Sequence, residues 1–183
     1  NFELDTGNPV MIGDQSAPVI KAGGNPLNLD SKIPDDFLAR TGAISTIFAR
    51  RGDDFIRVTT SLKKQDGTRA IGTLLDNTSP AYAKIMAGES FSGLATLFGK
   101  KYITKYQPVR DAQGSVIGIL FVGVDITSEY ADMRAKILSK RIGEQGYFFV
   151  LNSAPGKDLG KYLVPAPEEG KTPAWPEGVL EQV

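Results

Sequence analysis

Two arginines and several hydroxyl side chains recur at strand-like spacing in the middle of the chain. Arg57 and Thr59 alternate with apolar residues in FIRVTTSL, and Arg69 and Thr73 follow in TRAIGTLL. A guanidinium group binds a carboxylate through paired hydrogen bonds, and hydroxyl groups add further donors. These residue types therefore suit a binding site for a small organic anion.

A third segment, YITKYQP, carries aromatic and hydroxyl side chains at every second position. Because side chains alternate along a strand, Tyr102, Thr104 and Tyr106 share one face. The three segments can meet over one side of a sheet and form an apolar-walled pocket with a few convergent donors. The predicted ligand-binding residues are Arg57, Thr59, Arg69, Thr73, Tyr102, Thr104 and Tyr106.

The same pattern has ordinary structural explanations. An arginine on a strand is often exposed to solvent, threonine is a common strand residue, and alternating tyrosines usually pack against a core. Tyr82, or Phe91 and Phe98, would have to cover the face to make it a pocket. The pattern alone leaves open which of Arg57 and Arg69 points inward.

The composition excludes several kinds of chemistry. The 183 residues include no histidine and no cysteine, and the net charge is zero. A Ser–His or Cys–His nucleophile pair, a histidine zinc site and a disulfide are therefore impossible. A neutral chain has no overall field to attract nucleic acid. We expect a binding protein without metal or cofactor, without a nucleic-acid partner and without enzymatic activity.

One short segment, ELDTGN, resembles the Asp-Thr-Gly triplet of aspartic proteases, in which two carboxylates share a proton. The chain contains no second copy of the triplet, although a homodimer could supply one. Asp-Thr-Gly is also good turn chemistry, and we interpret it as a turn. An aspartic-type hydrolase acting through Asp5 is kept as the alternative from another functional class.

Turn and capping signals divide the first two thirds of the chain into strands and two helices. Two short strands are expected before IPDDFLARTG, which predicts a helix, and Ser79–Gly88 predicts a second one. Hairpin turns are predicted at RGD, Asp66–Gly67, Gly99–Lys100 and Asp111–Gly114. The return strand of the second hairpin would be TRAIGTLL.

Two strands have informative faces. In FIRVTTSL, we expect the face with Ile56, Val58, Thr60 and Leu62 to belong to the core. VIGILFVGV is apolar at nearly every position, so it should be a central strand that is buried on both faces.

The pattern changes at Thr127, where helical spacing replaces alternation. We predict a sensor domain over residues 1–126, a connecting helix over 127–145, and the start of a second, truncated unit over 146–183. The tail after residue 165 is rich in Pro, Gly and Glu and is expected to be irregular. The predicted fold class is α+β, with a central antiparallel sheet flanked by helices.

The segments FIRVTT with DGTRAIGTLLD, and YITKYQPVRDAQGSVIGILFVGV, carry a family resemblance. Together with GYFFVL they make the chain similar to the extracytoplasmic Cache sensor domain of bacterial methyl-accepting chemotaxis proteins. The subtype is the one in which two Cache units are fused. The resemblance runs from Gly42 to about Leu151.

The resemblance implies a PAS-like fold and a small-molecule ligand between sheet and helices. It implies a short-chain carboxylate or other organic acid, or an amino acid, as that ligand. It also implies a periplasmic domain of an inner-membrane receptor that works as a homodimer and signals across the membrane. No apolar run spans a membrane, so any anchor is expected in flanking segments. A sensor histidine kinase is the alternative receptor type.

Overall fold

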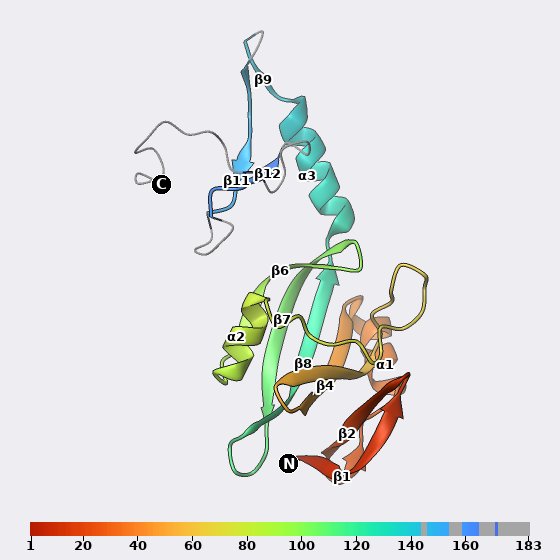
Figure 1. Ribbon diagram of the computed structural model, residues 1–183. Coiled ribbons are helices and arrows are strands. Elements are labelled where there is room, and N and C mark those ends of the chain that lie inside the picture. The colour runs from red at the N-terminus through yellow and green to blue at the C-terminus, as the bar shows by residue number, and fades with distance from the viewer. Residues whose placement is uncertain (144–145, 154–158, 165–170, 172–183) are drawn as a thin grey trace. The chain divides into compact units, whose positions relative to one another are not determined.

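The structure is a computed structural model that describes residues 1–143, 146–153, 159–164 and 171 (Figure 1). The chain divides into two compact units, Asn1–Ile126 and Thr127–Val183, called here the N-terminal and C-terminal units. Each unit is described by itself.

The N-terminal unit is built on a five-stranded antiparallel sheet. Its strand order is β5-β4-β8-β7-β6, so β8 is the central strand, as the sequence predicted. Hairpins are formed by β4 with β5, β6 with β7, and β7 with β8, and β8 also pairs with β4. The strands are β4 (Ile44–Arg51), β5 (Asp54–Thr60), β6 (Phe91–Leu97), β7 (Lys100–Arg110) and β8 (Val116–Asp125).

A second, smaller sheet is formed by the N-terminal residues. It contains β1 (Phe2–Ile12), β2 (Gln15–Ala22) and β3 (Asn25–Pro26), in that order. The predicted pair of short strands is thus present, although β1 is longer than expected. The pairing of β1 with β2 is interrupted between Asp5 and Val10.

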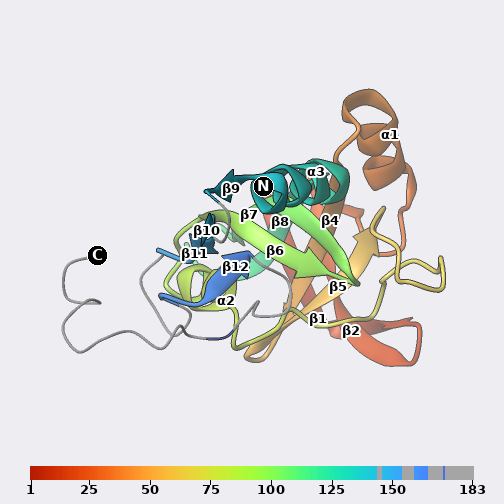
Figure 2. The same ribbon diagram turned by 90° about the horizontal axis from the view of Figure 1, so that it is seen from above.

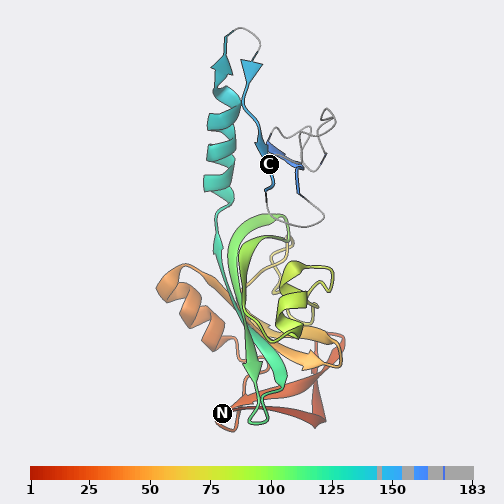
Figure 3. The same cartoon turned by 90° about the vertical axis from the view of Figure 1, so that its left-hand side faces the viewer.

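The two helices of this unit lie on opposite sides of the large sheet, as Figures 2 and 3 both show. The first helix, α1 (Lys32–Thr41), ends at Gly42, whose φ of 72° and N–H bond to Leu38 suit glycine. The second helix, α2 (Pro80–Met86), begins at Ser79, whose side chain accepts from the Tyr82 N–H. Both predicted helices are therefore confirmed.

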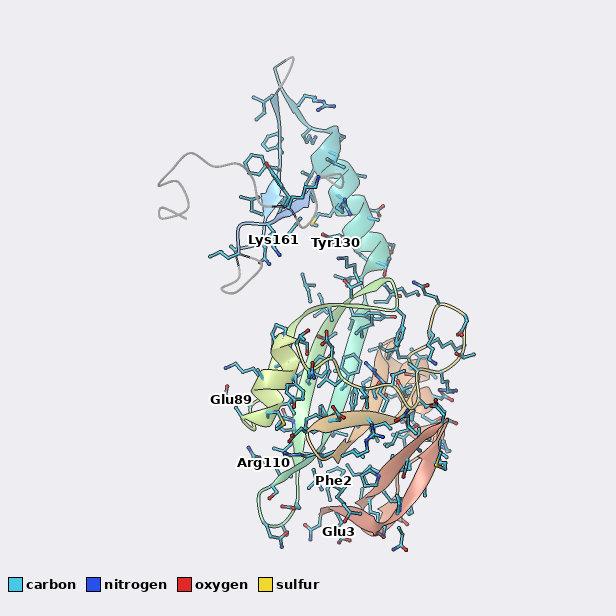
Figure 4. All side chains as sticks on the ribbon, in the orientation of Figure 1. Phe2, Glu3, Glu89, Arg110, Tyr130 and Lys161 are labelled. Atoms are coloured by element: carbon cyan, nitrogen blue, oxygen red, sulfur yellow. The ribbon has the colours of Figure 1, made fainter. Side chains whose placement is uncertain are left out.

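Arg110 connects the end of β7 to the end of α2. Its Nη2 donates to the Gly88 carbonyl at 2.8 Å and its Nη1 to the Gly114 carbonyl at 2.6 Å. Figure 4 shows Arg110 close to Glu89, where α2 ends. These bonds help to hold α2 over its face of the sheet.

Each face of the large sheet has its own core. On one face, Ile56 and Val58 pack with Ile12 and Ile20 of the small sheet. On the other face, apolar side chains of the sheet and of α2 form a second cluster; they include Phe48, Phe55, Ala81, Ile85, Tyr106 and Phe121. Strand β5 is consequently buried on both sides.

A β-bulge between β4 and β5 changes which side chains share a face. Ile47 pairs with Thr59, whereas Phe48 pairs with Arg57, so one residue of β5 is left without an opposite partner. A bulge of this kind interrupts the alternation along a strand. Arg57 therefore faces the α2 side with Phe48, while Thr59 faces the other side with Ile47. The predicted shared face of Arg57 and Thr59 is wrong for this reason.

Three further expectations need correction. TRAIGTLL forms no strand; only isolated bridges join Lys63 to Arg69 and Ile56 to Leu74. Strand β8 is buried on both faces at its beginning but exposes Leu120 and Val124. The β6–β7 turn consists of residues 98–99, one position earlier than predicted.

The C-terminal unit begins with α3 (Thr127–Ser139), none of whose side chains is buried. Short antiparallel pairs follow: β9 (Arg141–Ile142) with β10 (Gly146–Tyr147), and β11 (Val150–Leu151) with β12 (Tyr162–Val164). The predicted irregular tail lies outside the described residues, Lys171 excepted. Over the described part of the chain, helix length and hydropathy nowhere reach what a membrane span requires.

Gly118 of β8 should tolerate no side chain. A Cβ there would lie 2.4 Å from the Phe48 carbonyl oxygen, which is backbone and cannot rotate away. We expect Gly118→Ala to destabilise the domain by about 2 kcal/mol or more in chemical denaturation, an overpacking effect. Gly123→Ala on the same strand is the control, because its Cβ would meet side-chain atoms at 3.1 Å or more. Equal stability losses in the two variants would contradict the tight approach of β8 to β4.

Candidate functional site

Arg57 is a buried cation on the α2 side of the sheet. Its side chain is 5% exposed, and it makes no ion pair with any described residue. The backbone of Arg57 is fixed by the segment that runs along the free edge of β5. Its N–H donates to the Thr73 carbonyl, and its carbonyl accepts from the Gly72 N–H, both at 2.9 Å.

One edge of the guanidinium group is hydrogen-bonded, and the other has no hydrogen-bond partner among the described residues. Nη1 makes both hydrogen bonds of the Arg57 side chain to the described residues, to Thr73 Oγ1 at 2.7 Å and to the Leu74 carbonyl at 3.3 Å. Nε is buried and has no hydrogen-bond partner. A buried donor without a partner is costly and uncommon in native proteins. The edge formed by Nε and Nη2 has the two parallel donors that a carboxylate accepts from.

Aromatic rings surround this cation. The guanidinium carbon lies 4.8 Å from the centroid of the Phe48 ring and 6.0 Å from that of Phe98. Such cation–π contacts stabilise a buried guanidinium group but neutralise none of its charge. Tyr106 is buried nearby and packs on Phe121, with ring centroids 4.7 Å apart.

The pKa values of Arg57 and Tyr106 both reflect the burial of these groups. Burial lowers the pKa of Arg57 to about 10, and the nearby Tyr106 opposes this effect. The group remains cationic at neutral pH, at a cost of about 3 kcal/mol of lost solvation. Burial also raises the pKa of Tyr106, while Arg57 acts in the opposite direction. A bound anion would relieve this penalty.

Arg69 is engaged elsewhere. Its Nη1 and Nη2 donate to the two carboxylate oxygens of Asp35 in α1, at 2.8 and 2.7 Å, and Nη1 also donates to the Thr60 carbonyl. Asp35 therefore occupies the two parallel donors of Arg69 that an anionic ligand would need. The two arginines are therefore distinguished: Arg57 points inward, and Arg69 ties α1 to β5.

The predicted hydroxyl and tyrosine residues separate into different environments. Thr73 contacts Arg57 directly and donates to the Ala70 carbonyl at 2.7 Å, so it holds the guanidinium in place. The Thr59 hydroxyl donates to the Asp30 carbonyl, on the segment before α1. The Thr104 hydroxyl donates to the Gly93 carbonyl of β6. Tyr102 is buried in a small cluster beside Leu62 and Ala70.

Phe98 has an unusual backbone conformation. Its φ is 48°, and Gly99, the other residue of this two-residue turn, has φ of 84°. Two positive φ values are typical of type I′ hairpin turns, which favour Asn-Gly. An aromatic residue in this position carries strain of order 1 kcal/mol. The strained turn places the Phe98 ring near Arg57. Sequence patterns did not predict the positive φ at Phe98.

Other chemistry finds no support in the described part of the chain. The Asp5 carboxylate accepts from the Gly7 and Asn8 N–H groups and pairs with Lys21 at 3.0 Å. The triplet, which we interpreted as a turn, lies within β1, where the pairing with β2 is interrupted. The described residues contain no cluster of acidic side chains that could hold a metal ion.

Residues 1–174 match the model of the Cache 3/Cache 2 fusion domain. The chain belongs to this family. No curated protein matches it at a significant level. The resemblance to a sensor domain of fused Cache units is confirmed, as is the α+β, PAS-like Cache fold with its central antiparallel sheet. Cache domains are extracytoplasmic sensors that bind small molecules, and the unpartnered edge of Arg57 is the candidate ligand site.

The Asp35–Arg69 pair can be tested by titration. Hydrogen bonds from Arg69 hold the pKa of Asp35 below its ordinary value of 3.8. The stabilisation from this pair is present above that value and is lost as the pH falls through the lowered one. Replacing Arg69 by Met should raise the pKa of Asp35 toward 3.8, measured by NMR of the carboxyl carbon.

Asp66 is the control for that titration. Its pKa is lowered chiefly by hydrogen bonds from Thr68, so it should not respond to the replacement of Arg69. An unchanged Asp35 in the Arg69→Met variant would mean that the ion pair does not form in solution.

The strain at Phe98 predicts a difference between two substitutions. Phe98→Ala and Phe98→Asn both remove the ring, but asparagine accepts positive φ far better than alanine. The Asn variant should be more stable than the Ala variant by roughly 1 kcal/mol in urea denaturation. Equal stabilities would argue against the left-handed conformation at this turn.

Proposed function

We propose that this Cache domain senses a small organic acid for a bacterial chemoreceptor, and that Arg57 binds the acid's carboxylate. The observation that carries this proposal is a buried cation, 5% exposed, whose Nε has no hydrogen-bond partner. It has no counter-charge among the described residues. Thr73 orients the guanidinium group, and the Tyr106 hydroxyl is the candidate second donor to the ligand.

The receptor context extends the same proposal. The domain would lie in the periplasm, in an inner-membrane receptor that works as a homodimer. Residues 127–145 would connect to a second Cache-like unit that starts at residue 146. The division into compact units after Ile126 supports the first of these boundaries. A sensor histidine kinase would use the same ligand site, and the domain downstream of the second unit distinguishes the two receptor types.

A thermal-shift screen of carboxylates tests the ligand site. A ligand at about 100 times its dissociation constant adds about 2.7 kcal/mol to the stability of the wild-type chain. The Arg57→Met variant should show no such increase with the same ligand. Without ligand, this variant should be as stable as wild type or more stable, because it no longer buries an unbalanced charge.

Arg40→Met is the matched control, since Arg40 is an exposed residue of α1. It should retain the full ligand response. If no carboxylate stabilises the wild-type chain and Arg57→Met loses several kcal/mol, Arg57 is a structural residue and the proposed site is wrong.

A further inference from the structure

The charge balance around Arg57 limits what a ligand can carry. Within the described parts of the chain, no aspartate or glutamate is buried. Apart from Arg57, the buried polar side chains are hydroxyls: Thr46, Thr59, Thr60, Ser61 and Thr104. The guanidinium group thus contributes one positive charge that no protein group near it balances.

Neighbouring cations are held in other interactions. Arg69 is paired with Asp35, as described above. Arg50 lies on the same face of the sheet as Phe48, which is two positions earlier on β4. Arg50 pairs across strands with Phe55, and Phe48 pairs with Arg57. Its Nε donates to the Gly52 carbonyl at 2.8 Å and its Nη1 to the Val116 carbonyl at 3.2 Å. Arg50 is partly exposed, so water solvates its charge.

Three kinds of carboxylate differ in the charge they leave in this site. A monocarboxylate brings one negative charge and leaves the buried site neutral. An amino acid is zwitterionic, so its ammonium group leaves one positive charge without a carboxylate to pair it. A dicarboxylate leaves one negative charge without a second free cation. Burial of an unpaired charge costs several kcal/mol, which makes the neutral combination the favoured one.

The aromatic side chains around Arg57 favour a ligand whose part beyond the carboxylate is apolar. Phe48 and Phe98 contact the guanidinium group through their ring faces, and Tyr106 is packed between Phe91 and Phe121. A methyl or short alkyl group buries favourably against such rings, whereas a second polar group finds few partners there.

We infer that the Arg57 site selects a monocarboxylate that carries neither an ammonium group nor a second carboxylate. The acid binds through paired hydrogen bonds to Nε and Nη2, with its alkyl part against the aromatic rings. This inference rests on the proposed function, because it specifies the ligand of the same site.

A panel of four matched compounds tests it by calorimetric titration of the full chain. Propionate is the reference, L-alanine adds an ammonium group, succinate adds a carboxylate, and propionamide removes the charge. We expect propionate to bind best and the other three to bind at least roughly 30-fold more weakly, since each leaves a charge unbalanced. Arg57→Met should abolish propionate binding, and the exposed control Arg40→Met should not.

The outcomes separate the two proposals. If L-alanine or succinate binds as tightly as propionate, and Arg57→Met abolishes that binding, the monocarboxylate inference is overturned while the ligand site stands. Arg50→Ala then shows whether Arg50 holds the second carboxylate of succinate. If propionamide matches propionate, charge is not what the site recognises. If none of the four binds, the inference and the proposed organic-acid site both fail.

Discussion

A positive charge buried among aromatic rings is the constraint around which the N-terminal unit is organised. Every other charged side chain among the described residues keeps some contact with water, whereas Arg57 is 5% exposed. Folding alone gains little from such a group, since an apolar residue of similar size would avoid the loss of solvation. The proposed ligand would supply the counter-charge that the described residues lack.

Several irregular features of the fold converge on this residue. The bulge between β4 and β5 turns Arg57 toward α2 and Thr59 away from it. The segment beyond β5 forms no strand, yet it bonds the backbone and side chain of Arg57 through Thr73. The same segment carries Arg69, which binds Asp35 of α1. One segment thus hydrogen-bonds both to Arg57 and to α1.

Sequence patterns were sufficient for the regular parts of this architecture. Gly42, Ser79 and the Asp111–Gly114 turn have local signatures that fix helix ends and a hairpin, and the apolar run of β8 marks the central strand. The site was less predictable because it depends on departures from period two. The residues around Arg57 and Thr59 contain no signal for the bulge that places them on different faces. The partner of Arg69, Asp35, is 34 positions away in the chain, so local patterns cannot identify it.

The most direct test is a crystal structure of the chain with saturating propionate. The account predicts carboxylate density with its two oxygens about 2.7–2.9 Å from Nε and Nη2 of Arg57, while Nη1 keeps its bonds to Thr73 and Leu74. Density for the acid at another position, or a closed aromatic core around an unliganded Arg57, would contradict it.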